Sequence, residues 1–393
     1  MTEARRTQAI LLLTQFAERT GVTGARPPER YLWTDAFAVC TFLGLGRGTG
    51  EARFRDLALA LIDQVHRTLG MHRDDDTRKG WLSGLDGREG EAHPTRGGLR
   101  IGKKLPERAP GEPVDDELEW DRDGQYFHYI TKWMHALDQA ARDTGRPEYN
   151  VWARELAEAS HRAFAFEPRG GGRRMHWKMS IDLSRPLVAS MGQHDPLDGF
   201  LTCAELEATA QTLNEPVLGP HVADLAADFA SMIDFHNLPT ADPLGLGGLL
   251  MDADRIDQLA RTGVVDISGG SLLESLLTAA FVGLERYARA GDLRRRADRR
   301  LAFRELGLSI GLAAVSALTE RVEADKARYP EASDVRMLLK EIGRHAPLRA
   351  EIEAFWLRPE NRETTLWLEH RNINDVMLAT SLEPEGFLVI TAS

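Results

Sequence analysis

The hydrophobic pattern of this chain repeats with the period of a helix over most of its length. Residues 31–45 and 301–322 are apolar nearly all round, which is typical of helices buried on most faces. Residues 149–166 and 221–235 instead carry apolar side chains on one face and charged side chains on the other. The same periodicity predicts further helices over residues 51–69, 125–145, 203–213, 271–291, 333–344, 347–357 and 364–382.

The alternation of these two kinds of helix predicts an inner and an outer layer. Alternating strand patterns are nearly absent, and the chain shows no clear sequence repeat of the kind that marks a regular solenoid. We therefore expect an all-α fold, an (α/α)6 toroid or barrel of helical hairpins, in a single domain over residues 1–393. An irregular all-α protein is the alternative.

One long segment interrupts the helical pattern. Residues 71–124 are rich in glycine, proline and charge, and no helix is predicted there. Irregular segments of this length within a compact domain are uncommon and are usually functional or disordered. We expect an inserted irregular loop that is either a lid over the mouth of the barrel or a solvated surface loop. As a lid, it would bring Arg100 and Lys103, together with Arg96 and Lys104, to an acidic or phosphorylated group of a substrate.

Charge and composition exclude several classes of partner. The formal net charge of −11 argues against general nucleic-acid binding and against an anionic membrane surface. The chain has no long uninterrupted apolar run, and Ala9–Leu13 is too short for a signal-peptide core, so we expect a helix of the mature protein there. Cys40 and Cys203 lack metal-ligand spacing. We expect no disulfide framework, no metal, no cofactor and a cytoplasmic location.

Three stretches combine aromatic and acidic or basic residues: "RYLWTDAFAV", "WDRDGQYFHY" and "HWKMS". With these stretches and its paired helices, the chain resembles the six-hairpin glycosidase-like (α/α)6-barrel superfamily. The resemblance is architectural, covers most of the chain and singles out no specific family. That superfamily includes glycoside hydrolases, unsaturated-uronide hydrolases and sugar isomerases of the N-acylglucosamine 2-epimerase type. The resemblance implies a carbohydrate bound at one mouth of the barrel.

Four segments place aromatic rings beside charged groups at the expected ends of inner helices. Rings can stack on the apolar face of a sugar, while carboxylate, arginine and asparagine side chains bind its hydroxyl groups. The predicted substrate-binding residues are Trp33, Asp35, Trp120, Tyr126, His128, His176, Trp177, Lys178, Glu369, His370 and Arg371.

Glycoside cleavage requires two carboxyl groups that flank the scissile bond. We predict one catalytic carboxyl from Asp121 or Asp123 and the other from Asp195 or Asp198, with His194 orienting the carboxyl or the sugar. Both pairs stand next to glycine, where the backbone can approach a ligand closely. In the alternative interpretation, Asp123 caps the helix at 125–145 and Asp198 caps a helix at 200–213.

Two other functions compete with glycoside hydrolysis. A sugar epimerase or isomerase would use imidazoles as acid and base, because their pKa lies near neutrality. The candidates are His128, His176, His194 and His370, although each could be no more than a hydrogen-bonded histidine on a packed helix. The third function is a non-catalytic α/α scaffold that binds a ligand or protein. For both enzymes the expected partner is a small-molecule carbohydrate, and homo-oligomer formation is compatible with the sequence.

Overall fold

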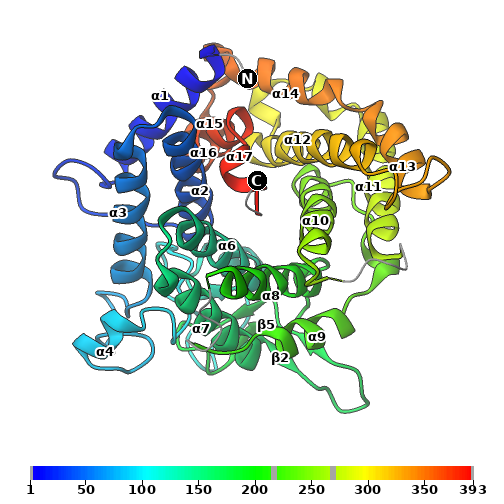
Figure 1. Ribbon diagram of the computed structural model, residues 1–393. Coiled ribbons are helices and arrows are strands. Elements are labelled where there is room, and N and C mark those ends of the chain that lie inside the picture. The colour runs from blue at the N-terminus through cyan, green and yellow to red at the C-terminus, as the bar shows by residue number, and fades with distance from the viewer. Residues whose placement is uncertain (1–2, 214–218, 266–270, 391–393) are drawn as a thin grey trace. The chain divides into compact units, whose positions relative to one another are not determined.

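The computed structural model describes residues 3–213, 219–265 and 271–390. The predicted all-α fold is confirmed, because 65% of the chain is helical and strands are few. The chain forms two compact units, one of residues 17–233 and one of residues 1–16 with 234–393 (Figure 1).

The unit of residues 17–233 contains two rows of helices. Each helix of the first row packs on its neighbour and on a partner of the second row, as predicted for helical hairpins (Figure 1). The first row consists of α2 (Leu32–Thr49), α6 (Phe127–Thr144) and α8 (Asp195–Thr212), and the second of α3 (Ala52–Leu69), α7 (Pro147–Phe164) and α9 (Ala223–Ser231). The first helices of the two rows differ in burial. In α2, of the first row, every residue from Leu32 to Leu43 is buried, whereas α3, of the second row, buries one stripe that includes Phe54, Leu61 and Val65.

The unit that ends at the C-terminus repeats this arrangement. Its first row is α10 (Pro243–Thr262), α12 (Ala302–Ala324) and α16 (Arg371–Leu382). The helices α1 (Glu3–Arg19), α11 (Ser271–Ala290), α13 (Asp334–Gly343), α14 (Pro347–Leu357), α15 (Thr365–Glu369) and α17 (Glu385–Leu388) complete it. The helix predicted over 364–382 is therefore two helices, which meet at His370.

The helix α12 is long and apolar enough to cross a membrane by length and composition alone. In its most apolar stretch of 18 residues, 72% of the residues are buried. The helix packs chiefly against α10, α13, α14 and α16. This is the pattern of a core helix, which must be apolar all round because other helices cover most of its faces.

Residues 71–124 are irregular, as predicted, apart from two short helices. These are α4 (Gly87–Ala92) and α5 (Asp116–Asp121), whose first backbone N–H groups are capped by the side chains of Asp86 and Asp115. A small antiparallel sheet, in the order β1 (Gln125–Tyr126), β4 (Lys178–Met179) and β5 (Pro186–Val188), follows. A second sheet pairs β2 (Ala165–Phe166) with β3 (Arg174–Met175). These strands are too short to produce an alternating pattern in the sequence.

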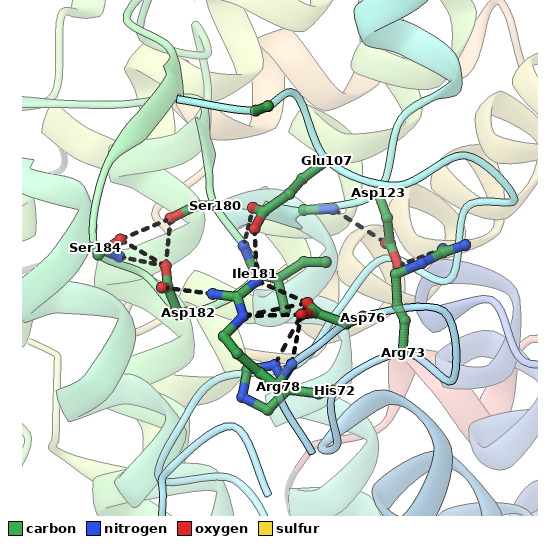
Figure 2. A network of polar contacts seen from close by, with 12 residues as sticks. His72, Arg73, Asp76, Arg78, Glu107, Asp123, Ser180, Ile181, Asp182 and Ser184 are labelled. Carbon is green, nitrogen blue, oxygen red and sulfur yellow. Dashed lines mark hydrogen bonds and ion pairs between the residues drawn. The ribbon is translucent and has the colours of Figure 1, made fainter. Parts of the chain in front are cut away.

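A polar network fastens the 71–124 segment to the turn between β4 and β5 (Figure 2). The Arg78 guanidinium donates to Asp182 of that turn at 2.7 Å, to Asp76 at 2.8 Å and to Glu107 at 2.9 Å. Glu107 also accepts the backbone N–H of Ile181 at 2.7 Å. Any lid movement of this segment would therefore have to break several charge-assisted hydrogen bonds.

Candidate functional site

Two predicted catalytic carboxyls lie in the first turn of α8. The helix begins at Asp195, so Asp198 stands inside its first turn and does not cap a helix that starts later. Residues three apart share one helix face, so the two side chains are neighbours. His194 precedes the helix in the capping position, where its side chain makes no capping hydrogen bond. The electrostatics of a helix N-terminus favour negative charge at this place.

The Asp195 carboxyl is buried without a full set of partners. Asp195 is 4% exposed, and its Oδ2 has no hydrogen-bond partner within the described part of the chain. Burial, and then the charge of Asp198, raise the pKa of Asp195 to about 7, while Lys132 and the Gly192 backbone act in the opposite direction. A carboxyl with this pKa is partly protonated near neutrality, so it can serve as a proton donor.

Gly192 makes room for this carboxyl. A Cβ atom at position 192 would lie 2.3 Å from Oδ2 of Asp195, much closer than real contacts allow. The glycine noted in the sequence is therefore required for the close approach of the 190–194 backbone to the Asp195 carboxyl.

Asp198 is paired with a lysine from the neighbouring helix. Nζ of Lys132, on α6, donates to Oδ1 of Asp198 at 2.6 Å, and both residues are buried. The ammonium group favours the ionised carboxylate. His128 stands one turn before Lys132. Burial lowers the pKa of His128 to about 4; the charge of Asp198 raises this pKa, and the charge of Lys132 lowers it. The site thus places an uncharged imidazole beside the Lys132–Asp198 ion pair.

An aromatic cluster adjoins these groups. At its centre the ring of Tyr126 lies 5.3 Å from the rings of His128 and Trp177, and the latter two are nearly parallel at 5.9 Å. The pairing of β1 with β4 produces this contact, because it sets Tyr126 opposite Lys178, next to Trp177. The full aromatic cluster comprises Tyr31, Trp33, Trp120, Tyr126, His128, Tyr129 and Trp177.

The edges of the aromatic cluster reach solvent. Trp120 is 53% exposed, and its ring lies 4.9 Å from that of Trp177. The hydroxyl groups of Tyr31 and Tyr129 are hydrogen-bonded at 2.7 Å, and the ring of Trp33 lies 5.4 Å from Tyr129. Such a surface can stack on a sugar ring while its hydroxyl and imidazole groups bind sugar hydroxyls.

A second carboxylate lies near the aromatic cluster. Asp121 is exposed at the end of α5 and makes no hydrogen bond or ion pair with the described residues, and its charge is one of the influences that raise the pKa of Tyr126 after burial. Lys103 is half-buried with Nζ 5.6 Å from the centroid of the Tyr31 ring. Burial lowers its pKa, against the charges of Asp121 and Asp123. Two predicted residues, Asp121 and Lys103, are therefore placed where a ligand of the aromatic cluster could reach them.

Asp123 is held by structural partners, which argues against the predicted catalytic role. The residue is 0% exposed, its Oδ2 accepts from Arg100 at 2.6 Å and from Arg73 at 3.3 Å, and its Oδ1 accepts the backbone N–H groups of Gly102 and Gly124. It does not cap the next helix either, since α6 begins after Tyr126 without any side-chain cap. No oxygen of this carboxylate is left for a substrate.

The partners of Arg100 and Lys178 likewise argue against their predicted contacts with a substrate. The Arg100 guanidinium is occupied by Asp123 and by the carbonyl oxygens of Thr68 and Met71. Lys178 is fully buried, and its Nζ donates to the carboxylate of Glu119 and to two backbone carbonyls. The charged group of each side chain is hydrogen-bonded to residues far away along the chain, which the local sequence did not reveal.

Two other predicted residues lie beside the aromatic cluster rather than in it. The carboxylate of Asp35 accepts the backbone N–H of Tyr31 at 2.9 Å and faces Arg30 at 3.4 Å, and burial raises its pKa to about 6. It thereby fixes the start of α2, where Tyr31 and Trp33 stand. His176 stacks on Phe166 with the ring centroids 4.0 Å apart.

The remaining predicted residues belong to the C-terminal unit. Glu369, His370 and Arg371 are exposed at the junction of α15 and α16. The His370 ring lies 5.7 Å from Phe303, and the Arg371 guanidinium lies 3.6 Å from Asp375. Their participation in substrate binding stays a prediction.

Three residues of the site were not among the predicted ones. Tyr31 and Tyr129 belong to the aromatic cluster, and Lys132 pairs with Asp198. Lys132 could have been found from the sequence, because it stands four residues after His128 and so lies on the same helix face. Tyr31 directly precedes Leu32 at the start of α2. Over residues 3–213, 219–265 and 271–390, no group of three or more His, Cys, Asp or Glu residues could hold a metal ion.

Comparisons with known proteins concern the fold. No protein-family model matches the chain, and a search of curated proteins found no relative. Among solved structures, a GH76 α-mannanase from Bacteroides thetaiotaomicron is similar with a TM-score of 0.52 and 10% identity, covering 97% of this chain and 96% of that one. A family 76 glycoside hydrolase from a bovine strain of the same species gives 0.50 and 11%, covering 97% and 77%. These likenesses show the fold alone: the chain has an (α/α)6 fold like that of these two proteins.

Proposed function

We propose that this protein is a carbohydrate-active enzyme, specifically a glycoside hydrolase with Asp195 as its general acid. One observation carries the proposal: a buried carboxyl with an unpartnered oxygen and a pKa near 7 stands one helical turn from the lysine-paired Asp198. Two carboxyls whose environments differ in this way are the acid and base pair that glycoside cleavage requires.

In the proposed reaction Asp195 protonates the leaving glycosidic oxygen. Asp198, paired with Lys132, attacks the anomeric carbon as the leaving group departs, and water then hydrolyses the glycosyl-enzyme with Asp195 acting as the base. Neighbours on one helix face have Cβ atoms roughly 5–6 Å apart, comparable with the separation of about 5–5.5 Å between the carboxyls of retaining enzymes. We therefore expect retention of the anomeric configuration. Asp121 is the alternative second carboxyl.

The aromatic cluster supports a sugar substrate. Its exposed ring edges and faces, together with the tyrosine hydroxyl groups, provide stacking surface and hydrogen bonds. The similarity to an α-mannanase makes α-mannosides the first substrates to test. Of the basic residues predicted to meet an acidic substituent, Arg100 is taken up by Asp123 and Arg96 by Glu155, which leaves Lys103 near the aromatic cluster. Lys103 supports a preference for substrates with an acidic or phosphorylated group.

Sugar isomerisation by histidines has less support. Burial makes His128 a weak base, since its pKa is lowered to about 4. His176 is stacked on Phe166, outside the aromatic cluster. His128 therefore lacks the near-neutral pKa, and His176 the placement, that proton transfer beside a carbonyl of a sugar bound at the aromatic cluster requires.

Turnover of a panel of α-mannosides and other glycosides by matched variants tests the proposal. Asp195→Asn should lower kcat by about 10²–10⁴-fold, as expected for loss of a general acid, with no loss of melting temperature. Asp224→Asn, an exposed position on α9, is the control and should leave turnover unchanged. Full activity of Asp195→Asn would reject the proposal. Deuterium uptake from solvent into a released isomer would favour the isomerase, and no turnover across the panel would favour a binding scaffold.

We also propose a cytoplasmic location. It is supported by Cys40 and Cys203, which are both free and buried. Homo-oligomer formation stays a prediction.

A further inference from the structure

A hollow of about 140 Å³ lies in the unit of residues 17–233, among α3, α7 and the segment around α4. It shares no residue with the aromatic cluster or with the carboxyls of α8. Its walls include Trp81, Tyr149 and Trp152, and the Tyr149 and Trp152 rings meet edge to face at 5.3 Å. Three large aromatic side chains around one small hollow provide stacking surface for a single ring.

One lining residue presents a fixed hydrogen-bond donor. Nε2 of His66 accepts the indole N–H of Trp133 at 3.2 Å, so the proton of the neutral imidazole must lie on Nδ1. Burial lowers the pKa of His66 to about 3, which keeps the ring neutral. Nδ1 makes no hydrogen bond to the described residues, and the His66 ring meets that of Trp152 edge to face at 5.2 Å. The imidazole N–H is therefore a donor without a hydrogen-bond acceptor among the described residues.

The rim offers both donors and acceptors without net charge. The Arg67 guanidinium donates to Oδ1 of Asp63 at 3.2 Å and to Oε1 of Glu91 at 3.1 Å. Each of these groups keeps one nitrogen or oxygen that makes no hydrogen bond to the described residues. Arg146, also at the rim, lies over the Tyr149 ring at 4.9 Å. Two positive and two negative side chains thus surround the opening.

We propose that this hollow binds one neutral sugar ring, at a site separate from the candidate active site. Aromatic walls fit the apolar face of a pyranose, and alternating donors and acceptors fit its hydroxyl groups. The balanced rim gives no preference for an anion, and Arg146 over Tyr149 opposes a cation held against the rings. The volume suits a monosaccharide unit rather than a chain. The inference does not depend on hydrolysis.

Fluorine NMR of the full chain labelled with 5-fluorotryptophan tests this site directly. The chain has eight tryptophans, and the signals of Trp81 and Trp152 can be assigned with Trp81→Phe and Trp152→Phe. Titration with D-mannose and D-glucose should shift these two signals with a Kd of about 1–10 mM, the range expected for a ligand with so few atoms. The Trp33 and Trp177 signals report the aromatic cluster in the same spectrum. Shifts confined to them, or no shift at all, would overturn the proposal.

Two matched pairs of variants complete the test. Leu59 lines the hollow and is half-buried, so Leu59→Trp should fill it and weaken binding by about tenfold or more, whereas Leu57→Trp on the same helix should not. A second pair serves if Leu59→Trp fails to fold. Arg67 and Arg53 are both exposed, so neither change to alanine should prevent folding. Arg67→Ala should weaken binding several-fold because Arg67 lines the hollow, whereas Arg53→Ala should not. Asp195→Asn should leave the shifts of Trp81 and Trp152 unchanged. Undiminished binding by Leu59→Trp or Arg67→Ala would contradict the proposal.

Discussion

Asp195 and Asp123 are both buried aspartates of the same unit, yet they have different chemistry. The Asp123 carboxylate is surrounded by two guanidinium groups and several backbone N–H groups. Asp195 has the Gly192 backbone as a donor, a nearby negative charge on Asp198 and an oxygen without a partner. Burial is therefore not what marks a catalytic carboxyl. The difference is whether the ionised form is stabilised by the surrounding protein, which decides how easily the group gains a proton.

The same isosteric change should have opposite effects on stability at the two positions. Asp123→Asn leaves the buried Arg100 without its counter-charge, and breaking such a pair costs about 3–5 kcal/mol. Asp195→Asn removes a charge that the site disfavours, so the free energy of unfolding at pH 7 should stay equal or rise. Urea denaturation of both variants measures the difference. Equal destabilisation by the two changes would remove the distinction between them.

The two carboxyls should also differ in pH dependence. The pKa of Asp195 is about 7 in the folded protein against 3.8 for the free group, so the folded state binds this proton more tightly. The stabilisation it provides is complete below pH 3.8 and is lost as the pH rises through 7. The stability of Asp195→Asn relative to the natural chain should therefore increase by a few kcal/mol between pH 4 and pH 8. Thermal unfolding across this range checks the sign, and a constant difference would show that Asp195 titrates normally.

Crowding of the Asp195 carboxyl should disturb activity more than stability. Gly192→Ala would place a Cβ 2.3 Å from Oδ2, forcing the side chain or the loop to move. We expect a loss of about 1–3 kcal/mol in stability, typical of overpacking, together with a clear fall in kcat. Gly248→Ala is the control, because a Cβ there would meet nothing within 4 Å. Unchanged kinetics of Gly192→Ala would show that the position of this carboxyl is not critical.

The smallest effect is expected at Arg78, whose ion pairs are more exposed than that of Arg100. Its side chain is 38% exposed, so solvent screens its interactions with Asp182 and Glu107. Arg78→Gln should cost about 1 kcal/mol and should speed hydrogen exchange in the turn of residues 180–185. Lys79→Gln provides the comparison, since Nζ of Lys79 donates to a backbone carbonyl of Asp74. Equal exchange in the two variants would indicate that Arg78 does not hold this turn.

Part of the candidate site could be predicted from local sequence. Tyr126, His128 and Trp177 were selected because aromatic residues stand beside charges, and the structure brings their rings together. The choice between Asp121 and Asp123 could not be made, although they are two residues apart. Arg100, which occupies Asp123, lies 23 residues away, and Lys132, which pairs with Asp198, lies 66 residues away.

The sequence by itself determined the helices and their layers, because the burial of a helix face is written in a period of 3.6 residues. It also placed acids and aromatic rings at the helix starts. Only the tertiary structure decided which acids are neutralised and which stand exposed or unpartnered. Ion pairs and ring contacts act between side chains that are near in space, and the electrostatics of a carboxyl depend on that neighbourhood rather than on its neighbours along the chain.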